Sequence, residues 1–151
     1  MKRILFIASL VLFFVSCEGP QGPPGRAGQD GVTNRVILDF EVTEWTMIVD
    51  NNDLFLRWEA YFDVDDLDEY IYNNAAIVAY KEDVYNDYKV QKSLPIVVNY
   101  EDRNSILWFQ RIDFDYAISA RGAGSVVFSV ENSDFREDHP GSMWFRVVFM
   151  W

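Results

Sequence analysis

Alternation of apolar and polar residues constrains the fold of this chain more than any other feature of its sequence. From Val36 to Val42 every second residue is apolar, and the residues between them include Asp39 and Glu41. Successive side chains of a β-strand point to opposite faces of a sheet, so this pattern gives a strand one apolar and one polar face. Similar short segments, separated by polar or turn-forming residues, occur at 45–49, 54–62, 75–80, 89–94, 96–100, 106–119, 126–130 and 143–151.

No helical period extends beyond two turns, so the sequence predicts an all-β domain. Short strands with turn signals about every ten residues are typical of an antiparallel β-sandwich or barrel, here of seven to nine strands. Immunoglobulin-like and jelly-roll strand orders are both compatible with this pattern.

The segments between the strands carry signals of their own. Residues 50–53, Asp-Asn-Asn-Asp, tolerate left-handed backbone and predict a hairpin between the second and third strands. In segment 63–74, we expect Asp66 to cap a single helical turn from Leu67 to Tyr72. Pro95 cannot donate to a hydrogen-bonded ladder, and it therefore belongs at a sheet edge or a bulge.

Three further local features lead to expectations. The polar, tyrosine-rich segment 82–88 is interpreted as a loop. Gln110 falls on the apolar side of segment 106–119, which suggests a bulge or a change of sheet nearby. Trp151 follows an apolar strand segment, and we expect it to be tied into the core.

Glycine and proline are concentrated before residue 32, which marks a domain boundary. Five of the eight glycines and three of the five prolines precede it. Segment 32–151 has 120 residues, close to the commonest domain size, so we expect one β-sandwich domain with one core.

Glycine recurs at every third position of segment 17–31. These glycines are Gly19, Gly22, Gly25, Gly28 and Gly31. The segment reads as Gly-Pro-Gln, Gly-Pro-Pro, Gly-Arg-Ala and Gly-Gln-Asp, the repeat that a collagen triple helix requires because only glycine fits its crowded axis. Four triplets are short for a triple helix, so two interpretations stay open, a homotrimeric stalk and a stiff monomeric spacer.

The first sixteen residues have the organisation of an export signal. Lys2 and Arg3 form a basic start, and segment 4–15 is apolar except for one serine. This apolar stretch is shorter than the roughly 20 residues that span a bilayer, so cleavage is expected. Phe14-Val15-Ser16-Cys17 resembles the bacterial lipobox, with phenylalanine in place of the usual leucine, and Cys17 is the only cysteine. The sequence therefore predicts a lipidated Cys17, since two or three acyl chains anchor a protein stably.

Together, the signal, Cys17, the Gly-x-y repeat and the β-rich remainder resemble the small collagen-like lipoproteins of Gram-negative bacteria, particularly of the Bacteroidota. This resemblance implies export, lipidation and residence on the outer membrane, on either its periplasmic or its outer face. Glu18 is not the aspartate associated with inner-membrane retention. The resemblance does not imply a particular activity.

The net charge and the motifs of the chain limit the classes of function that it can have. The formal net charge of −11 disfavours nucleic acid as a partner. Walker, Rossmann and nucleic-acid signatures are absent, and we expect no cofactor. The chain has a single histidine, His139, and no thiol besides Cys17, so it has few of the side chains that zinc sites and nucleophilic catalysis require. His139 is interpreted as a loop residue beside Pro140. A carboxylate pair for hydrolysis has no sequence signal of its own.

Two groups of residues are candidates for ligand binding. Exposed aromatic faces beside polar groups can hold sugars or peptides, and this candidate patch contains Tyr70, Tyr72, Tyr85 and Tyr88. Clustered carboxylates can hold calcium, and the weak calcium candidate contains Asp63, Asp65, Asp66 and Asp68, although its spacing does not match an EF-hand loop. The alternative interpretations are core packing for the tyrosines and a solvated acidic loop for the aspartates.

The first functional hypothesis is a non-enzymatic, lipid-anchored envelope or cell-surface protein, in which the spacer presents the β-sandwich for adhesion or assembly with an unknown protein or glycan partner. The alternative is a β module that binds glycan or calcium, and an enzyme comes third.

Overall fold

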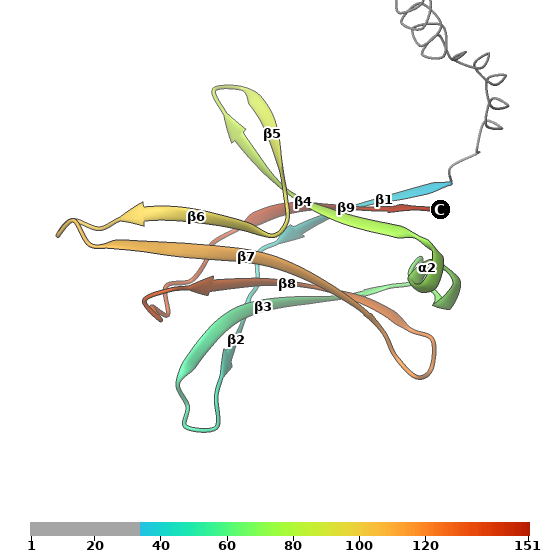
Figure 1. The fold of residues 1–151 in the computed structure, drawn as a ribbon, viewed down its shortest axis with the longest axis horizontal. Coiled ribbons are helices and arrows are strands. Elements are labelled where there is room, and N and C mark those ends of the chain that lie inside the picture. Colours follow the sequence, from blue (N-terminus) through green and yellow to red (C-terminus); the bar gives the residue numbers. More distant parts are fainter. Residues whose placement is uncertain (1–33) are drawn as a thin grey trace, which may run out of the picture. The chain divides into compact units, whose positions relative to one another are not determined.

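The computed structural model describes residues 34–151, which contain nine strands and one short helix (Figure 1). The elements are β1 (Arg35–Val42), β2 (Thr46–Val49), β3 (Phe55–Val64), α2 (Glu69–Asn74), β4 (Ala76–Tyr85), β5 (Tyr88–Ser93), β6 (Ile96–Glu101), β7 (Leu107–Ile118), β8 (Gly124–Asn132) and β9 (Met143–Met150). The expected signal peptide, Cys17 and the glycines of the predicted collagen-like segment lie outside the described residues.

The strands form two antiparallel sheets, which confirms the predicted all-β sandwich. One sheet has the order β1-β9-β4-β5, and the other has the order β2-β3-β8-β7-β6. The chain passes directly between edge strands of the two sheets twice, from β1 to β2 and from β5 to β6. Pro95 lies in the second of these crossings, which confirms its expected place at a sheet edge.

Apolar side chains between the two sheets form the core. Phe128 of β8 stacks on Phe145 of β9, with ring centroids 4.1 Å apart, and both side chains are fully buried. The other fully buried core residues include Val42, Leu67, Ile112, Val126, Val130, Val147 and Phe149. Except for Leu67, which lies in the loop before α2, they come from the apolar sides of the alternating segments, so the pattern that predicts the strands also predicts most of the core.

Gly124 allows close packing at the start of β8. A Cβ atom there would lie 2.0 Å from the carbonyl oxygen of Leu67. Leu67 is completely buried, so the loop between β3 and α2 packs directly on this glycine.

Helix α2 begins later than predicted. Asp68, rather than Asp66, is the N-cap, and its carboxylate accepts a hydrogen bond of 2.8 Å from the Ile71 N–H. The expectation that Asp66 caps a turn from Leu67 to Tyr72 is therefore wrong. Leu67 is buried in the core, and this tertiary contact moves the start of the helix.

The loop expected at 82–88 is wrong as well, because most of it is strand. β4 continues to Tyr85 and joins β5 through Asn86 and Asp87, whose φ angles are 46° and 68°. Two residues with positive φ form the tight turn that matches the twist of a hairpin.

Gln110 lies in a regular part of β7, so the bulge expected there is wrong. It pairs with Val98 of β6 and with Asn132 of β8 without a shift of register. The register irregularity within residues 34–151 falls between Ile48 and Val49 instead.

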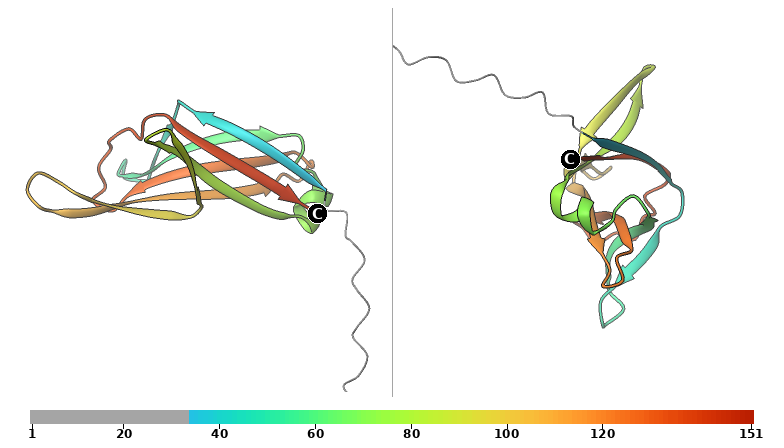
Figure 2. Two further views of the ribbon diagram at one scale, coloured as in Figure 1. Left: turned by 90° about the horizontal axis from the view of Figure 1, so that it is seen from above. Right: turned by 90° about the vertical axis from the view of Figure 1, so that its right-hand side faces the viewer.

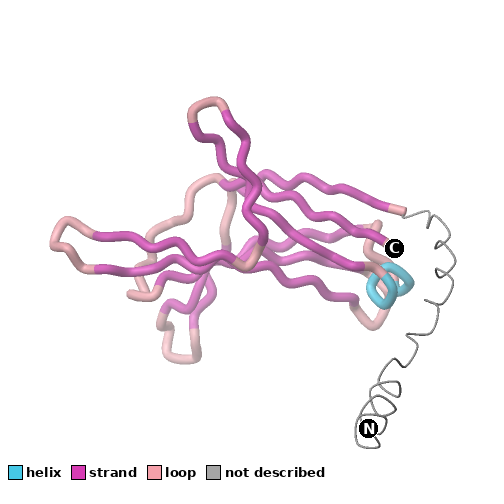
Figure 3. The backbone as a smooth tube through the Cα atoms, turned by 45° about the horizontal axis from the view of Figure 1, so that its top comes forward, coloured by secondary structure: helices cyan, strands magenta, loops and turns pink. Residues whose placement is uncertain are grey.

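The two ends of the sandwich differ. At one end, called the closed end, Asn34 and Trp151 exchange backbone hydrogen bonds of 2.8 and 3.0 Å, and α2 lies beside them (Figure 2). The partly buried Trp151 packs against the core there, as expected. At the other end, called the open end, the β2–β3, β4–β5 and β6–β7 hairpins diverge in three directions (Figure 3). The loop of residues 133–142 also lies at the open end.

Candidate functional site

A groove of about 370 Å³ lies at the open end, where the β4–β5 and β6–β7 hairpins diverge. We call it the end groove. Its walls are residues Lys81, Asp83, Tyr85, Lys92, Ile96, Val98, Tyr100, Trp108, Gln110, Ile112, Asn132, Asp138, His139, Pro140 and Met143. It is therefore lined by both sheets and by the loop of residues 133–142.

A change of side-chain chemistry along the inner faces creates the end groove. On β4, Ile77 and Ala79 pack in the core, whereas Lys81 and Asp83 occupy the next positions on the same face. Alternate residues of a strand share a face, so these two charged side chains extend the line of the core. Charged groups at such positions stay near water because full burial is costly.

The same change occurs in the facing sheet. On β8, Phe128 and Val130 are fully buried, and the next position on that face is Asn132. On β7, Ile112 is buried, and the next position towards the open end is Gln110. The apolar core therefore ends at the same level in both sheets, and the polar positions beyond it line the groove.

Two lysines and one carboxylate form the charged wall of the end groove. Asp83 accepts hydrogen bonds from Lys81 and from Lys92, the second at 3.0 Å, and the Tyr85 hydroxyl donates to the same carboxylate at 3.3 Å. Only 14% of the Lys81 side chain and 18% of the Asp83 side chain are exposed. The contacts hold each charged group in one position.

These contacts also set the protonation states. Burial has the largest single effect on the Asp83 pKa and raises it, but hydrogen bonds and charges from Lys81 and Lys92 together leave the pKa below its ordinary value. The pKa of Lys92 is raised, first by its hydrogen bond to the Tyr85 hydroxyl and then by its hydrogen bond to Asp83. Asp83 is thus an acceptor and Lys92 a donor at neutral pH.

An aromatic pair forms the opposite wall. Tyr100 of β6 stacks on Trp108 of β7, with ring centroids 4.4 Å apart and planes 16° from parallel. The Arg136 guanidinium lies 5.8 Å from the Trp108 ring, and Asp134 and Asp102 hold it at 2.6 and 3.4 Å. Both rings line the groove and are fixed by their neighbours.

Amide groups connect the wall to the loop. The Gln110 side-chain amide donates to the Asn132 side-chain oxygen at 3.2 Å, and the Asn132 amide donates to the Arg136 carbonyl at 3.0 Å. Asn132 is only 2% exposed, so its hydrogen bonds determine where the loop begins.

His139 lies in the loop, as expected, and it also lines the end groove. Its Nδ1 accepts a hydrogen bond of 3.1 Å from the Gly141 N–H, which assigns the proton of the neutral ring to Nε2. The ring packs edge-on against Trp58 at 5.2 Å. The histidine therefore supplies a fixed hydrogen-bond donor.

The four candidate tyrosines do not form one patch. Tyr85 lines the end groove, and Tyr88 pairs with it across the β4–β5 turn and is 75% exposed. Tyr70 and Tyr72 lie on α2 at the closed end, where Tyr72 packs against Tyr116. The ten residues of β4 separate the two pairs by about 30 Å, at roughly 3.3 Å per residue.

The four candidate calcium ligands have separate roles in the structure. Asp68 caps α2, and Asp63 accepts a hydrogen bond of 3.0 Å from the Tyr61 hydroxyl. Asp65 and Asp66 are exposed in the intervening turn. Between residues 34 and 151, no three histidine, cysteine or acidic side chains converge on a position that could hold a metal ion.

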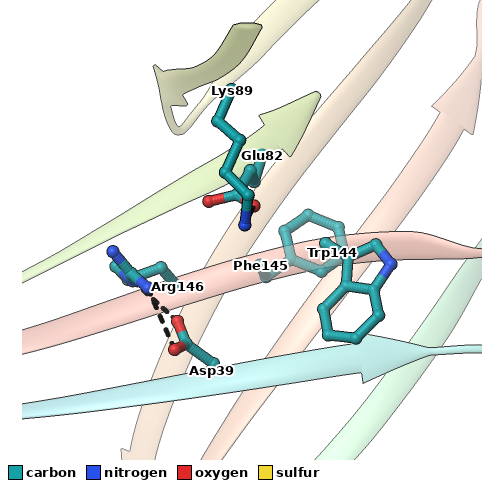
Figure 4. A pocket seen from close by; sticks show the side chains of 6 residues that line it. All are labelled: Asp39, Glu82, Lys89, Trp144, Phe145 and Arg146. Carbon is teal, nitrogen blue, oxygen red and sulfur yellow. Dashed lines mark hydrogen bonds and ion pairs between the residues drawn. The ribbon is translucent and has the colours of Figure 1, made fainter. Parts of the chain in front are cut away.

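A smaller depression, of about 100 Å³, lies on the outer face of the β1-β9-β4-β5 sheet (Figure 4). Trp144 is half exposed there, beside two ion pairs. Arg146 binds Asp39 through two contacts of 2.6 and 3.0 Å and lowers its pKa, and Lys89 binds Glu82 at 2.9 Å and lowers the pKa of that carboxyl. This surface is much smaller than the end groove, and Trp144 offers an exposed indole for comparison with Trp108.

The end groove contains residues that the sequence does not single out as a site. Gln110 is the one with a visible signal, a polar residue on the apolar side of its segment. The sequence alone does not mark the other four main residues of the groove as a site, because each is compatible with an ordinary strand. These residues are Lys81, Asp83, Tyr100 and Trp108, and only the pairing of the strands brings them together.

No helix in the part of the chain that the structure describes is long and apolar enough to cross a membrane. Comparison of the chain with protein-family models, curated proteins and solved structures gives no match.

Proposed function

We propose that this protein is a non-enzymatic, lipid-anchored envelope protein whose β-sandwich binds a neutral saccharide in the end groove and so serves in adhesion. One observation carries the proposal. At a single level of the sandwich, both sheets replace core residues with polar side chains, and a stacked aromatic pair lies beside them.

The chemistry of the groove suits a saccharide. A pyranose ring has apolar faces that pack on aromatic rings, and its hydroxyl groups donate and accept hydrogen bonds. Tyr100 and Trp108 offer aromatic surface, while Gln110, Lys92 and His139 offer polar groups. The volume of about 370 Å³ is in the usual range of small-ligand sites, about 300–1,000 Å³.

The charge balance favours a neutral ligand. The chain has a formal net charge of −11, yet the groove contains two ammonium groups, Lys81 and Lys92, against two carboxylates, Asp83 and Asp138. The charges within the groove cancel, so a neutral ligand meets matched donors and acceptors without net repulsion.

The position of the groove agrees with anchoring through Cys17. The described chain begins at Asn34, at the closed end, and β9 runs from Met143 beside the groove to Met150 beside Asn34. The length of β9 is roughly 23 Å, at about 3.3 Å per residue. A domain attached through Asn34 can therefore present the end groove away from its point of attachment.

A glycan array tests saccharide binding. We expect the purified protein to retain a set of neutral glycans, and we expect Trp108→Ala to weaken their binding by 10-fold or more because it removes the stacked ring. Trp144→Ala is the matched control, since it removes an exposed indole from the outer face. The proposal fails if the protein retains no neutral glycan, or if the two variants lose binding equally.

Mass spectrometry of the protein from its native cell tests the anchor separately. The expected N-terminus is Cys17 with the mass of a diacylglyceryl group and, where present, a third acyl chain. An intact segment 1–16, or a Cys17 terminus without acyl mass, would contradict lipid anchoring and leave the groove proposal standing.

A further inference from the structure

A second depression, of about 430 Å³, lies at the open end beside the β2–β3 turn. Its apolar lining comes from Leu54, Phe55, Leu56 and Phe135, and its carboxylates are Asp50, Asp53 and Glu137. None of these residues lines the end groove. We call this surface the acidic apolar depression.

The apolar side chains of this depression are unusually exposed. Leu54 is 63% exposed, Phe135 is 64% exposed, and Leu56 is 38% exposed. Isolated exposed apolar residues are common, but several that share one concave surface mark an interaction site.

The backbone holds Phe135 in this exposed position at a cost. Its φ angle is 56°, in the left-handed region that bulky residues rarely adopt. Its N–H donates to the Asn132 carbonyl at 3.0 Å, and the adjacent Arg136 is held by Asp134 and Asp102. The loop thus fixes an aromatic side chain that its own core does not bury.

The β2–β3 turn fixes the other side of the depression. The Asp50 carboxylate accepts hydrogen bonds from the backbone N–H groups of Asn52 and Leu54, at 2.8 and 2.9 Å. Both bonds lower the pKa of Asp50, and the bond from Leu54 has the larger effect. The carboxylate is therefore charged at neutral pH. Leu54 therefore follows a turn of defined shape.

The charges of Asp53 and Glu137 are not paired within the domain. Among residues 34–151, neither carboxylate takes part in an ion pair, and no basic residue lines the depression. The nearby Arg136 is already paired with two aspartates. Both carboxylates are therefore available to a basic partner, and the net charge of −11 favours the approach of one.

We infer that the acidic apolar depression binds a basic, apolar peptide segment of a partner protein, with an apolar side chain packed among Leu54, Leu56 and Phe135 and basic side chains beside Asp53 and Glu137. The three carboxylates do not converge as a metal site, and they surround an apolar floor that a metal ion would not use. The inference is independent of saccharide binding, because the two sites share no residue.

Fluorescence anisotropy with a labelled peptide of alternating leucine and lysine, used as the probe, tests the inference. Phe135→Asn removes the ring, and asparagine tolerates the left-handed backbone, so the loop keeps its shape. We expect Phe135→Asn to weaken binding by about 10-fold or more, as expected for loss of a buried aromatic side chain. We expect Glu137→Gln to weaken binding by about 2- to 5-fold, and more at low salt.

Two matched variants provide the controls. Tyr61→Ser removes another strongly exposed aromatic residue, and Asp65→Asn removes another exposed carboxylate, both away from the depression. We expect neither to change the affinity for the leucine–lysine peptide. Equal effects of Asp65→Asn and Glu137→Gln, equally tight binding of a serine–lysine peptide, or no binding of the leucine–lysine peptide would overturn the inference. Glycan binding by Phe135→Asn should stay unchanged.

Discussion

Replacing Asp83 by asparagine tests the charged wall of the end groove. The substitution keeps the shape of the side chain but removes the charge that Lys81 and Lys92 share. The Lys81 side chain is only 14% exposed, so water replaces the lost partner poorly. The Lys92 side chain is 36% exposed, and its contact contributes less because solvent screens it.

The expected cost follows from these contacts. A hydrogen bond to a charged group contributes about 1.5–3 kcal/mol when its partners are shielded, and an exposed ion pair contributes up to about 1 kcal/mol. We therefore expect Asp83→Asn to lower the free energy of unfolding by about 2 kcal/mol at pH 7. Urea denaturation followed by tryptophan fluorescence measures this as a lower midpoint at an unchanged slope.

The loss of stability caused by Asp83→Asn should become smaller as the pH falls. The folded-state pKa of Asp83 is lowered, so the stability that its charge contributes is present above the unfolded-state value of about 3.9 and is lost as the pH falls through the folded-state value. The wild-type protein and the variant should therefore converge in stability below about pH 4, as the wild-type carboxylate becomes protonated.

Asp113→Asn is the matched control, because Asp113 pairs with Arg111, whose side chain is 51% exposed. We expect this variant to cost less than about 1 kcal/mol. A cost of Asp83→Asn no greater than that of Asp113→Asn at pH 7, or a difference from wild type that persists unchanged at pH 2, would refute the reasoning.

Two other predictions concern packing and assembly. Gly124→Ala should lower the free energy of unfolding by about 3 kcal/mol, because the new Cβ meets the Leu67 carbonyl at 2.0 Å. Gly122→Ala meets nothing within 4 Å and should cost only about 1–2 kcal/mol for its left-handed φ of 82°, so equal costs in urea denaturation would contradict the packing argument. Sedimentation of the soluble chain with and without residues 18–31 separates the two interpretations of the Gly-x-y repeat. A trimer that dissociates on deletion indicates a stalk, and a monomer in both cases indicates a spacer.

The strands that build the core were predictable because a single pattern controls both their formation and their burial. An apolar residue at every second position, as from Val36 to Val42, leaves few alternatives to a half-buried strand. The continuation of β4 from Lys81 to Tyr85 was not predictable in this way, because Lys81, Glu82 and Asp83 place polar side chains on both faces of the strand. Cross-strand contacts such as Glu82 to Lys89 support strand pairing there.

The end groove was not predictable, because its residues come together only through long-range pairing. Gln110 and Asn132 are adjacent because β7 pairs with β8 in one register, and a shift of one residue would turn Gln110 to the outer face. All four candidate tyrosines are exposed, but they do not form the single patch that the sequence suggested. Tyr72 and Tyr85 lie near opposite ends of β4, and sequence proximity does not reveal that separation.

The indole N–H signals of the five tryptophans provide the most direct test of saccharide binding in the end groove. In a ¹H–¹⁵N correlation spectrum, titration with a neutral oligosaccharide retained by the protein on the array should shift the Trp108 signal in proportion to site occupancy. The Trp144 signal, on the outer face, should not move. A shift of Trp144 with Trp108 unchanged would place the saccharide on the outer face of the other sheet and would contradict the proposed site.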